Sequence, residues 1–170
     1  APRLEKIDSS MSVFPDRLRT IHQPPKELYV WGAFRDFQLP SIAIVGTRRC
    51  TSYGEEMARR FGMELARRGV VVVSGLARGI DQAAHIGVLE AGGVSIAVVP
   101  GDMPDFLARA PQEIQCRLLA QGAMISEWPL DYPVESWQFP VRNRLIAGLS
   151  LGVLVVEAPE KSGALITVTH

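Results

Sequence analysis

The chain has 170 residues, of which 47 % are hydrophobic and 21 % are charged, a balance typical of one soluble globular domain. Its 18 basic and 18 acidic residues cancel, so the overall charge attracts no polyanion, and any nucleic-acid site has to be a local patch. Arginine outnumbers lysine fifteen to three. Arginine is the better residue for bidentate phosphate contacts, although a GC-rich genome produces the same bias.

Neither cysteine, Cys50 or Cys116, has a second cysteine or a histidine at the spacing of a zinc site or a disulfide framework. No apolar run reaches the length of a membrane span, and the N-terminus lacks the pattern of an export signal. The sequence therefore predicts a cytoplasmic protein with no metal, no cofactor and no membrane partner.

The texture of the chain changes near residue 41. Residues 1–40 are rich in turns, contain one strand candidate at 28–31, and are expected to form a lead-in segment that packs on the core. Beyond them, apolar runs alternate with amphipathic helical patterns. Strands are predicted at 42–46, 70–73, 94–99, 123–126 and 152–157, and helices at 53–68, 80–91, 112–120 and from 140, with a further helix start at 162–164.

The strands predicted from residue 41 onward are continuously apolar, which indicates that helices cover both faces of their sheet. Alternating strands and helices then predict a mostly parallel, doubly wound α/β sheet for residues 41–170. The pattern stops soon after a strand-to-helix turn, where such a sheet usually continues. The domain is therefore expected to be incomplete at its C-terminal end.

Three strand-to-helix junctions carry small residues, at 46–49, 74–81 and 157–167. In an open parallel sheet, ligands bind outside the carboxyl ends of the strands, close to helix N-termini. Glycines there let backbone N–H groups approach a phosphate, although tight turns also need glycine for purely structural reasons. Hydroxyls and guanidiniums at these junctions add donors and charge, from Thr47, Arg48, Arg49, Ser74, Arg78, Ser162 and Thr167.

The run from Phe139 to Ser150 predicts a helix that begins near Pro140 and places Arg142 and Arg144 in its first turn. Cations at that end oppose the helix dipole, so a bound anion would explain them. The alternative is that both arginines pair with carboxylates elsewhere in the domain. Phe139 either stacks on a base or belongs to the core.

Catalytic candidates are few. Asp81 and His85 lie four residues apart on one predicted helix, but Asp81 stands where a first-turn acid belongs, and His85 is interpreted as a hydrogen-bonding residue rather than a base. Glu127 and Glu157 lack an evident partner. The chain has no dinucleotide, P-loop or nucleophile-elbow motif.

Taken together, the motifs resemble those of the DNA-processing protein A family (DprA/Smf) over about residues 13–170. The matching segments are the strand at 28–32, Val45-Gly46-Thr47-Arg48, Tyr53-Gly54, Val73 to Asp81, Ala84-His85, Ile125-Ser126-Glu127, Phe139 to Ser150, Val155 to Ala158 and Ser162 to Thr167. Each segment is weak by itself, and the combination is specific.

This resemblance implies an extended Rossmann-like domain that binds single-stranded DNA without catalysing a reaction. It also implies a homodimer that helps to load RecA recombinase onto incoming strands during natural transformation. The DNA-contacting residues that it implies are Gly46, Thr47, Arg48, Ser74, Gly75, Phe139, Arg142, Asn143, Arg144, Ser162 and Gly163, to which the loop pattern adds Arg49, Arg78 and Thr167.

One departure qualifies the resemblance. The segment at 101–111 lacks the family's usual Gly-Leu-Asp turn and Tyr-Pro-x-x-Asn pattern, so the resemblance does not imply a DNA contact from that loop. The alternative is an enzyme, because the same framework resembles nucleoside-monophosphate phosphoribohydrolases. Their Pro-Gly-Gly-x-Gly-Thr-x-x-Glu pattern is missing, and Pro-Glu-Lys-Ser-Gly stands at 159–163 instead.

Overall fold

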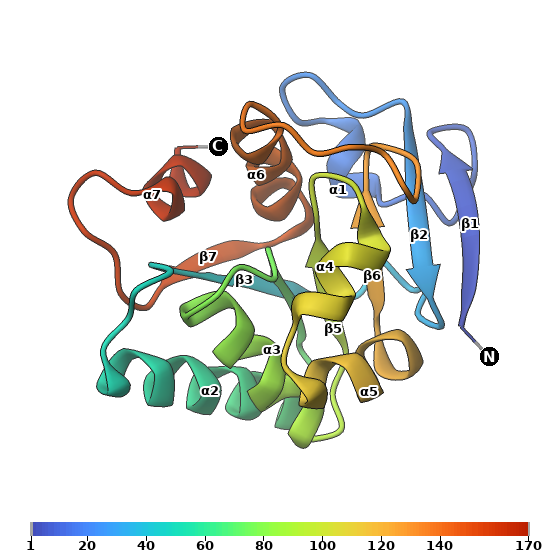
Figure 1. Cartoon of the computed structure of the whole chain (residues 1–170). Coiled ribbons are helices and arrows are strands. Elements are labelled where there is room, and N and C mark those ends of the chain that lie inside the picture. The colour runs from blue at the N-terminus through green and yellow to red at the C-terminus, as the bar shows by residue number, and fades with distance from the viewer. Residues whose placement is uncertain (1, 170) are drawn as a thin grey trace.

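The computed structural model describes residues 2–169, and within them seven strands form one sheet in the order β1-β2-β6-β5-β4-β3-β7 (Figure 1). The five strands from β6 to β7 in that order are parallel, β2 is antiparallel to β6, and β1 is antiparallel to β2. The strands are β1 (Arg3–Asp8), β2 (Glu27–Gly32), β3 (Ser41–Val45), β4 (Val71–Ser74), β5 (Ser95–Val98), β6 (Ala123–Ser126) and β7 (Gly152–Val155).

Helices cover both faces of the sheet. In Figure 1, α2, α3 and α5 lie on one side, and α1, α6 and α7 lie on the other. This arrangement confirms the predicted mostly parallel, doubly wound α/β fold. The helices are α1 (Asp16–Arg19), α2 (Ser52–Arg67), α3 (Ile80–Glu90), α4 (Met103–Arg109), α5 (Gln112–Gln121), α6 (Gln138–Leu149) and α7 (Gly163–Val168).

The central strand β4 shows why its sequence is continuously apolar. Val71 and Val73 belong to the core on the α1/α6 side, whereas Val72 belongs to the core under α2 and α3. Successive side chains of a strand point to opposite faces, so a strand buried on both sides needs apolar residues at every position. All four residues of β4 are buried.

Residues 1–40 contribute more structure than the single predicted strand. Besides β2 they form β1, which pairs with β2 along its whole length, and the short helix α1. Exposed and buried residues do not alternate regularly in β1, which explains why the sequence did not reveal it. β1 and β2 extend the sheet beyond β6.

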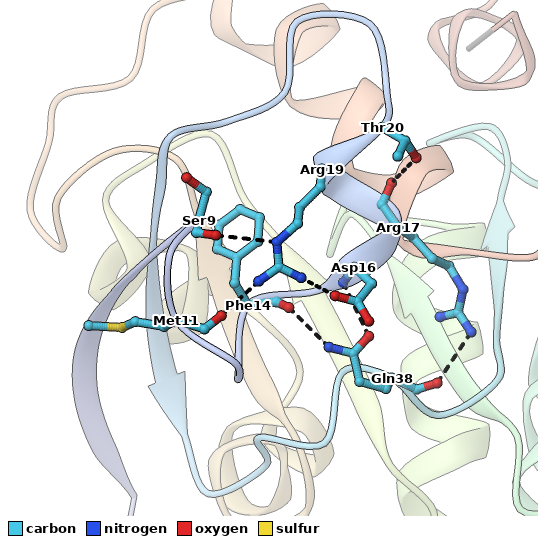
Figure 2. Close-up of polar contacts among 8 residues, drawn as sticks. All are labelled: Ser9, Met11, Phe14, Asp16, Arg17, Arg19, Thr20 and Gln38. Carbon is cyan, nitrogen blue, oxygen red and sulfur yellow. Dashed lines mark hydrogen bonds and ion pairs between the residues drawn. The ribbon is translucent and has the colours of Figure 1, made fainter.

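Hydrogen bonds hold the turn around α1 in place (Figure 2). The Arg19 guanidinium donates to the carbonyls of Ser9 (3.2 Å) and Met11 (2.7 Å) and pairs with Asp16. The Gln38 amide donates to the carbonyl of Phe14 at 3.0 Å and accepts from the Asp16 backbone N–H at 3.1 Å. The lead-in segment is therefore bound to the chain that enters β3.

Besides α1, two helices differ from the sequence prediction. α4 occupies the segment at 101–111, where no element was predicted, and Asp102 caps it by accepting from the Asp105 N–H at 3.3 Å. α6 begins at Gln138 rather than near Pro140, because a proline is tolerated in the first turn, where N–H groups have no partner within the helix. No helix within residues 2–169 is long and apolar enough to cross a membrane.

Candidate nucleic-acid interface

The strand order places a crevice at the carboxyl ends of β3 and β7. β3 pairs with β4 on one side and β7 on the other, and the chain leaves β3 and β7 toward opposite faces of the sheet (Figure 1). Such a reversal of strand order is where open α/β sheets form ligand sites. A cavity of about 760 Å³ lies there, walled by the loop after β3, the start of α6, the loop after β7 and α7.

The cavity brings together most of the predicted site residues from segments far apart in the sequence. Ten of the fourteen line it, namely Gly46, Thr47, Arg48, Arg49, Phe139, Arg142, Asn143, Ser162, Gly163 and Thr167. Four do not, namely Ser74, Gly75, Arg78 and Arg144. The lining also includes Glu157 and apolar residues that were not predicted, among them Ile146, Pro159, Ala164 and Ile166.

The Phe139 ring lies close to arginines from two different segments of the chain. The guanidinium carbon of Arg48 is 5.3 Å from the centroid of the ring, and that of Arg142 is 5.6 Å from it. The Phe106 ring packs 6.3 Å away, which ties Phe139 to α4. Guanidinium groups at these distances are attracted to the face of an aromatic ring. Phe139 is half-buried and therefore both packs in the wall and faces the cavity.

Arg142 is held by the protein and is only 5 % exposed. Its Nη1 donates to the carbonyls of Gly75 (3.0 Å) and Val98 (2.8 Å), and its Nε donates to Oδ1 of Asn143 (3.0 Å). Burial lowers the pKa of Arg142 to about 10, while nearby Asp81 raises it, so the side chain stays charged at neutral pH. The expected first-turn cation is thus a buried second-turn residue that joins α6 to the ends of β4 and β5.

Ser74 and Gly75 are also used inside the protein. The Ser74 hydroxyl donates to the carbonyl of Ile44 at 2.5 Å, and the Gly75 N–H donates to Oδ2 of Asp81 at 3.1 Å. Neither donor is left for a phosphate at this junction, contrary to the expectation from the loop pattern. Burial raises the pKa of Asp81 to about 6, although the Arg142 charge lowers it.

Arg144 points away from the cavity. Its guanidinium makes two hydrogen bonds with the carboxylate of Glu127 and a further one, at 3.1 Å, with the carbonyl of Gln23. The alternative of pairing with a carboxylate therefore describes Arg144, which does not line the cavity. Arg78 is exposed outside the cavity lining.

The loop after β3 keeps its shape through its own backbone. The Thr47 N–H donates to the Glu157 carbonyl at 2.7 Å, and the Arg49 N–H donates to the Thr47 hydroxyl at 3.2 Å. Those two N–H groups, which were expected to face a phosphate, are occupied. The side chains of Arg48 and Arg49 are exposed, and among residues 2–169 neither has a carboxylate within ion-pair distance.

Gly79 allows this loop to lie against the start of α3. Its φ of +84° is a conformation that other residues rarely adopt, and a Cβ there would lie 2.4 Å from the carbonyl oxygen of Thr47. The adjacent Ile80 N–H donates to that same oxygen at 3.3 Å. Gly79 therefore allows the loop that carries Arg48 to pack closely against the start of α3.

The wall formed by α7 contains an unsatisfied donor. The Ser162 hydroxyl oxygen is buried and has no hydrogen-bond partner among residues 2–169, and Thr167 is 2 % exposed. The Asn143 amide contacts the carbonyl of Gly163 at 3.4 Å, which links α6 to α7. A polar group entering the cavity would meet Ser162 as a free partner.

The Asp81 and His85 side chains, which were considered for catalysis, both make structural contacts. His85 is buried, and its Nδ1 lies 2.5 Å from the Ser95 hydroxyl, in agreement with its interpretation as a hydrogen-bonding residue. Burial lowers the pKa of His85 to about 3. No group of three or more potential metal ligands occurs among the residues that the structure describes.

The sheet order, the helices on both faces and the cavity at the strand reversal define a Rossmann-like α/β protein. A model of the DNA recombination-mediator protein A family matches residues 7–170, and the chain belongs to this family. It is 42 % identical to protein Smf of Escherichia coli over 167 residues, which are 98 % of this chain and 45 % of that protein.

Two solved structures of the family have the same fold. DNA processing protein A of Streptococcus pneumoniae superposes with a TM-score of 0.87 at 34 % identity, over 98 % of this chain and 59 % of that one. The Helicobacter pylori protein, whose structure was described for its single-stranded DNA binding mode, gives a TM-score of 0.82 at 28 % identity, over 98 % and 75 %. The chain spans about half the length of the curated relatives that it matches.

Proposed function

We propose that the cavity at the carboxyl ends of β3 and β7 binds single-stranded DNA, and that the chain does so without catalysing a reaction. The observation that carries this proposal is the guanidinium of Arg48, which forms no ion pair within residues 2–169 and lies beside the ring of Phe139 at the cavity wall. A cation next to an aromatic ring suits a nucleotide, whose phosphate and base need these two partners.

The charges and donors around the cavity support an anionic ligand. Arg48 and Arg49 contribute to its lining, and the exposed Lys161 lies in the adjoining loop. The buried Ser162 hydroxyl would donate to a phosphate oxygen. Contacts of this kind carry little sequence information, so binding should tolerate any sequence and weaken steeply with salt.

The relatives support a wider role for the whole protein. The family is described as recombination mediators, and the Helicobacter pylori relative is described as binding single-stranded DNA. We extend the proposal to a cytoplasmic homodimer that loads RecA recombinase onto incoming single strands in natural transformation. Stimulation of RecA-driven strand exchange would test the loading, and sedimentation velocity would test the dimer.

The test of DNA binding is fluorescence anisotropy with labelled oligo-dT at roughly 50 and 200 mM salt. Arg48→Ala should weaken binding and reduce the slope of log affinity against log salt by about 0.7, the value for one phosphate contact on a single strand. Arg117→Ala is the control, because Arg117 is an exposed arginine of α5 that does not line the cavity. Absence of binding at both salt concentrations, or equal affinity for a hairpin duplex, would contradict the proposal.

The phosphoribohydrolase alternative would require a carboxylate free to act as an acid or base. Both carboxylates that line the cavity accept hydrogen bonds from the protein: Asp81 from Gly75, and Glu157 from Thr51. The proposal therefore predicts that incubation with a panel of nucleoside monophosphates releases no free base, and release would favour the enzyme.

A further inference from the structure

Glu157 connects the end of β7 to the start of α2. Its Oε1 accepts from the Thr51 N–H at 3.0 Å, and its Oε2 accepts from the Thr51 hydroxyl at 2.7 Å, across 106 positions of sequence. The same hydroxyl oxygen accepts from the Gly54 N–H at 3.0 Å and so caps α2. The carboxylate thus holds the residue that begins the helix.

The backbone of Glu157 holds the other end of the same loop. Its carbonyl accepts from the Thr47 N–H at 2.7 Å, so one residue fastens the loop at both Thr47 and Thr51. The loop after β3 and the loop after β7 lie side by side at one end of the molecule (Figure 1). Between the two attachment points stand Arg48, Arg49 and Cys50, and the first two are the exposed cations of the cavity.

Gly54 leaves the space that this carboxylate occupies. A Cβ at Gly54 would lie 2.1 Å from Oε2 of Glu157, far inside van der Waals contact. Glycine inside a helix costs about 1 kcal/mol relative to alanine, so its presence in the first turn of α2 needs a reason. The close approach of Glu157 supplies that reason.

The position of Glu157 is unfavourable on charge alone, because it puts a carboxylate in the lining of a cavity for which an anionic ligand is proposed. We propose that Glu157 is a positioning residue, which fixes the loop after β3 so that Arg48 and Arg49 face the cavity before DNA arrives. This inference rests on the proposed binding of single-stranded DNA. Pre-organisation of this kind strengthens binding by reducing the ordering that the ligand has to impose.

The two roles predict opposite signs when the charge is removed. If Glu157 acted only through its charge, Glu157→Ala would tighten the binding of oligo-dT. As a positioning residue, the same substitution should weaken binding at least about fivefold, because the loop loses two hydrogen bonds to a charged group. Glu160→Ala is the matched control. Glu160 is exposed and lies on the same loop, and its substitution by alanine removes the same charge. It should leave affinity unchanged or raise it.

Two further variants disturb the connection while keeping the carboxylate. Gly54→Ala displaces the Glu157 side chain, and Thr51→Val removes one hydroxyl, so both should weaken binding, whereas Thr51→Ser should restore it. Thr51→Val added to Glu157→Ala should weaken binding by less than the sum of the two single changes, because both break the contact between the Thr51 hydroxyl and Oε2 of Glu157. Amide hydrogen exchange should show faster exchange of the Thr51 N–H in Glu157→Ala. Urea denaturation should show that the domain of this variant is still folded under the conditions of the binding assay.

The outcomes separate this inference from the proposed function. If the wild type fails to bind oligo-dT, the proposed function fails and the inference falls with it. If the wild type binds and Glu157→Ala binds equally well or more tightly, the positioning role is overturned and the DNA site stands. Equal weakening by Glu157→Ala and Glu160→Ala would also overturn it.

Discussion

Arg144 of α6 and Glu127 form a two-pronged ion pair, with Nη1 donating to Oε2 at 2.8 Å and Nη2 donating to Oε1 at 2.5 Å. The two side chains are only 11 % and 21 % exposed. Removal of one partner leaves the other charge poorly solvated, so Glu127→Ala and Arg144→Ala should each lower the free energy of unfolding by about 2 kcal/mol. Urea denaturation measures this.

The pairing of Arg144 with Glu127 also predicts that Arg144 and Arg48 affect the salt dependence of DNA binding differently. Because Arg144 is directed at Glu127, Arg144→Ala should leave the salt dependence of oligo-dT binding unchanged, whereas Arg48→Ala should reduce its slope. Anisotropy titrations at several salt concentrations, run below the unfolding transition of each variant, test the contrast. An equal reduction in both variants would show that Arg144 reaches the DNA.

The Phe139 ring should contribute to affinity through stacking. Phe139→Ala should weaken oligo-dT binding roughly tenfold, in the range found when an aromatic platform for one base is removed, and Phe139→Tyr should retain it. Phe61→Ala is the control, because Phe61 is a partly exposed aromatic of α2 that does not line the cavity. If Phe139→Leu binds as well as Phe139→Tyr, the ring serves packing alone.

Gly79 should be far less tolerant of a side chain than Gly92, although both have positive φ, +84° and +75°. Nothing lies within 4 Å of a Cβ at Gly92, so Gly92→Ala should cost about 1 kcal/mol from backbone strain alone. Gly79→Ala adds a clash with the Thr47 carbonyl and should cost about 3 kcal/mol or more. Thermal unfolding compares the two, and equal losses would contradict the close approach.

Two buried groups give the stability of the protein opposing dependences on pH. The pKa of Asp81 rises from 3.8 to about 6 on folding, so its contribution is full below pH 3.8 and is lost as the pH rises toward 6. The pKa of His85 falls from 6.5 to about 3, so its contribution is full above pH 6.5 and is lost as the pH falls toward 3.

Variants of these residues should therefore diverge from the wild type in opposite directions. Relative to the wild type, Asp81→Asn should gain stability as the pH rises from about 4 to 6. Relative to the wild type, His85→Gln should lose stability as the pH rises from about 3 to 6.5. Each difference should change by at most about 1.4 kcal/mol per pH unit. Urea unfolding at pH 4, 5, 6 and 7 measures both differences. Parallel stability curves would show that neither group changes its pKa on folding.

The fold class and the loops that line the cavity could be predicted from the sequence alone. Buried strands of a doubly wound sheet are apolar at every position, so β3 to β7 were visible as short apolar runs, and their order with the helices fixed the architecture. Glycines and hydroxyls after β3 and β7 marked the loops that line the cavity. β1 and α4 lacked such signals, because an edge strand is only partly buried and a short helix is set by its capping residue.

Which side chains line the cavity depends on tertiary packing and could not be predicted from the sequence pattern. Arg142 and Arg144 are two residues apart on α6, so they project about 200° apart around the helix axis, and sequence pattern does not say which one faces the strands. Packing buries Arg142 against the ends of β4 and β5 and turns Arg144 to Glu127. Glu157 showed no partner in sequence because Thr51 lies 106 positions away, and only the pairing of β3 with β7 brings the two together.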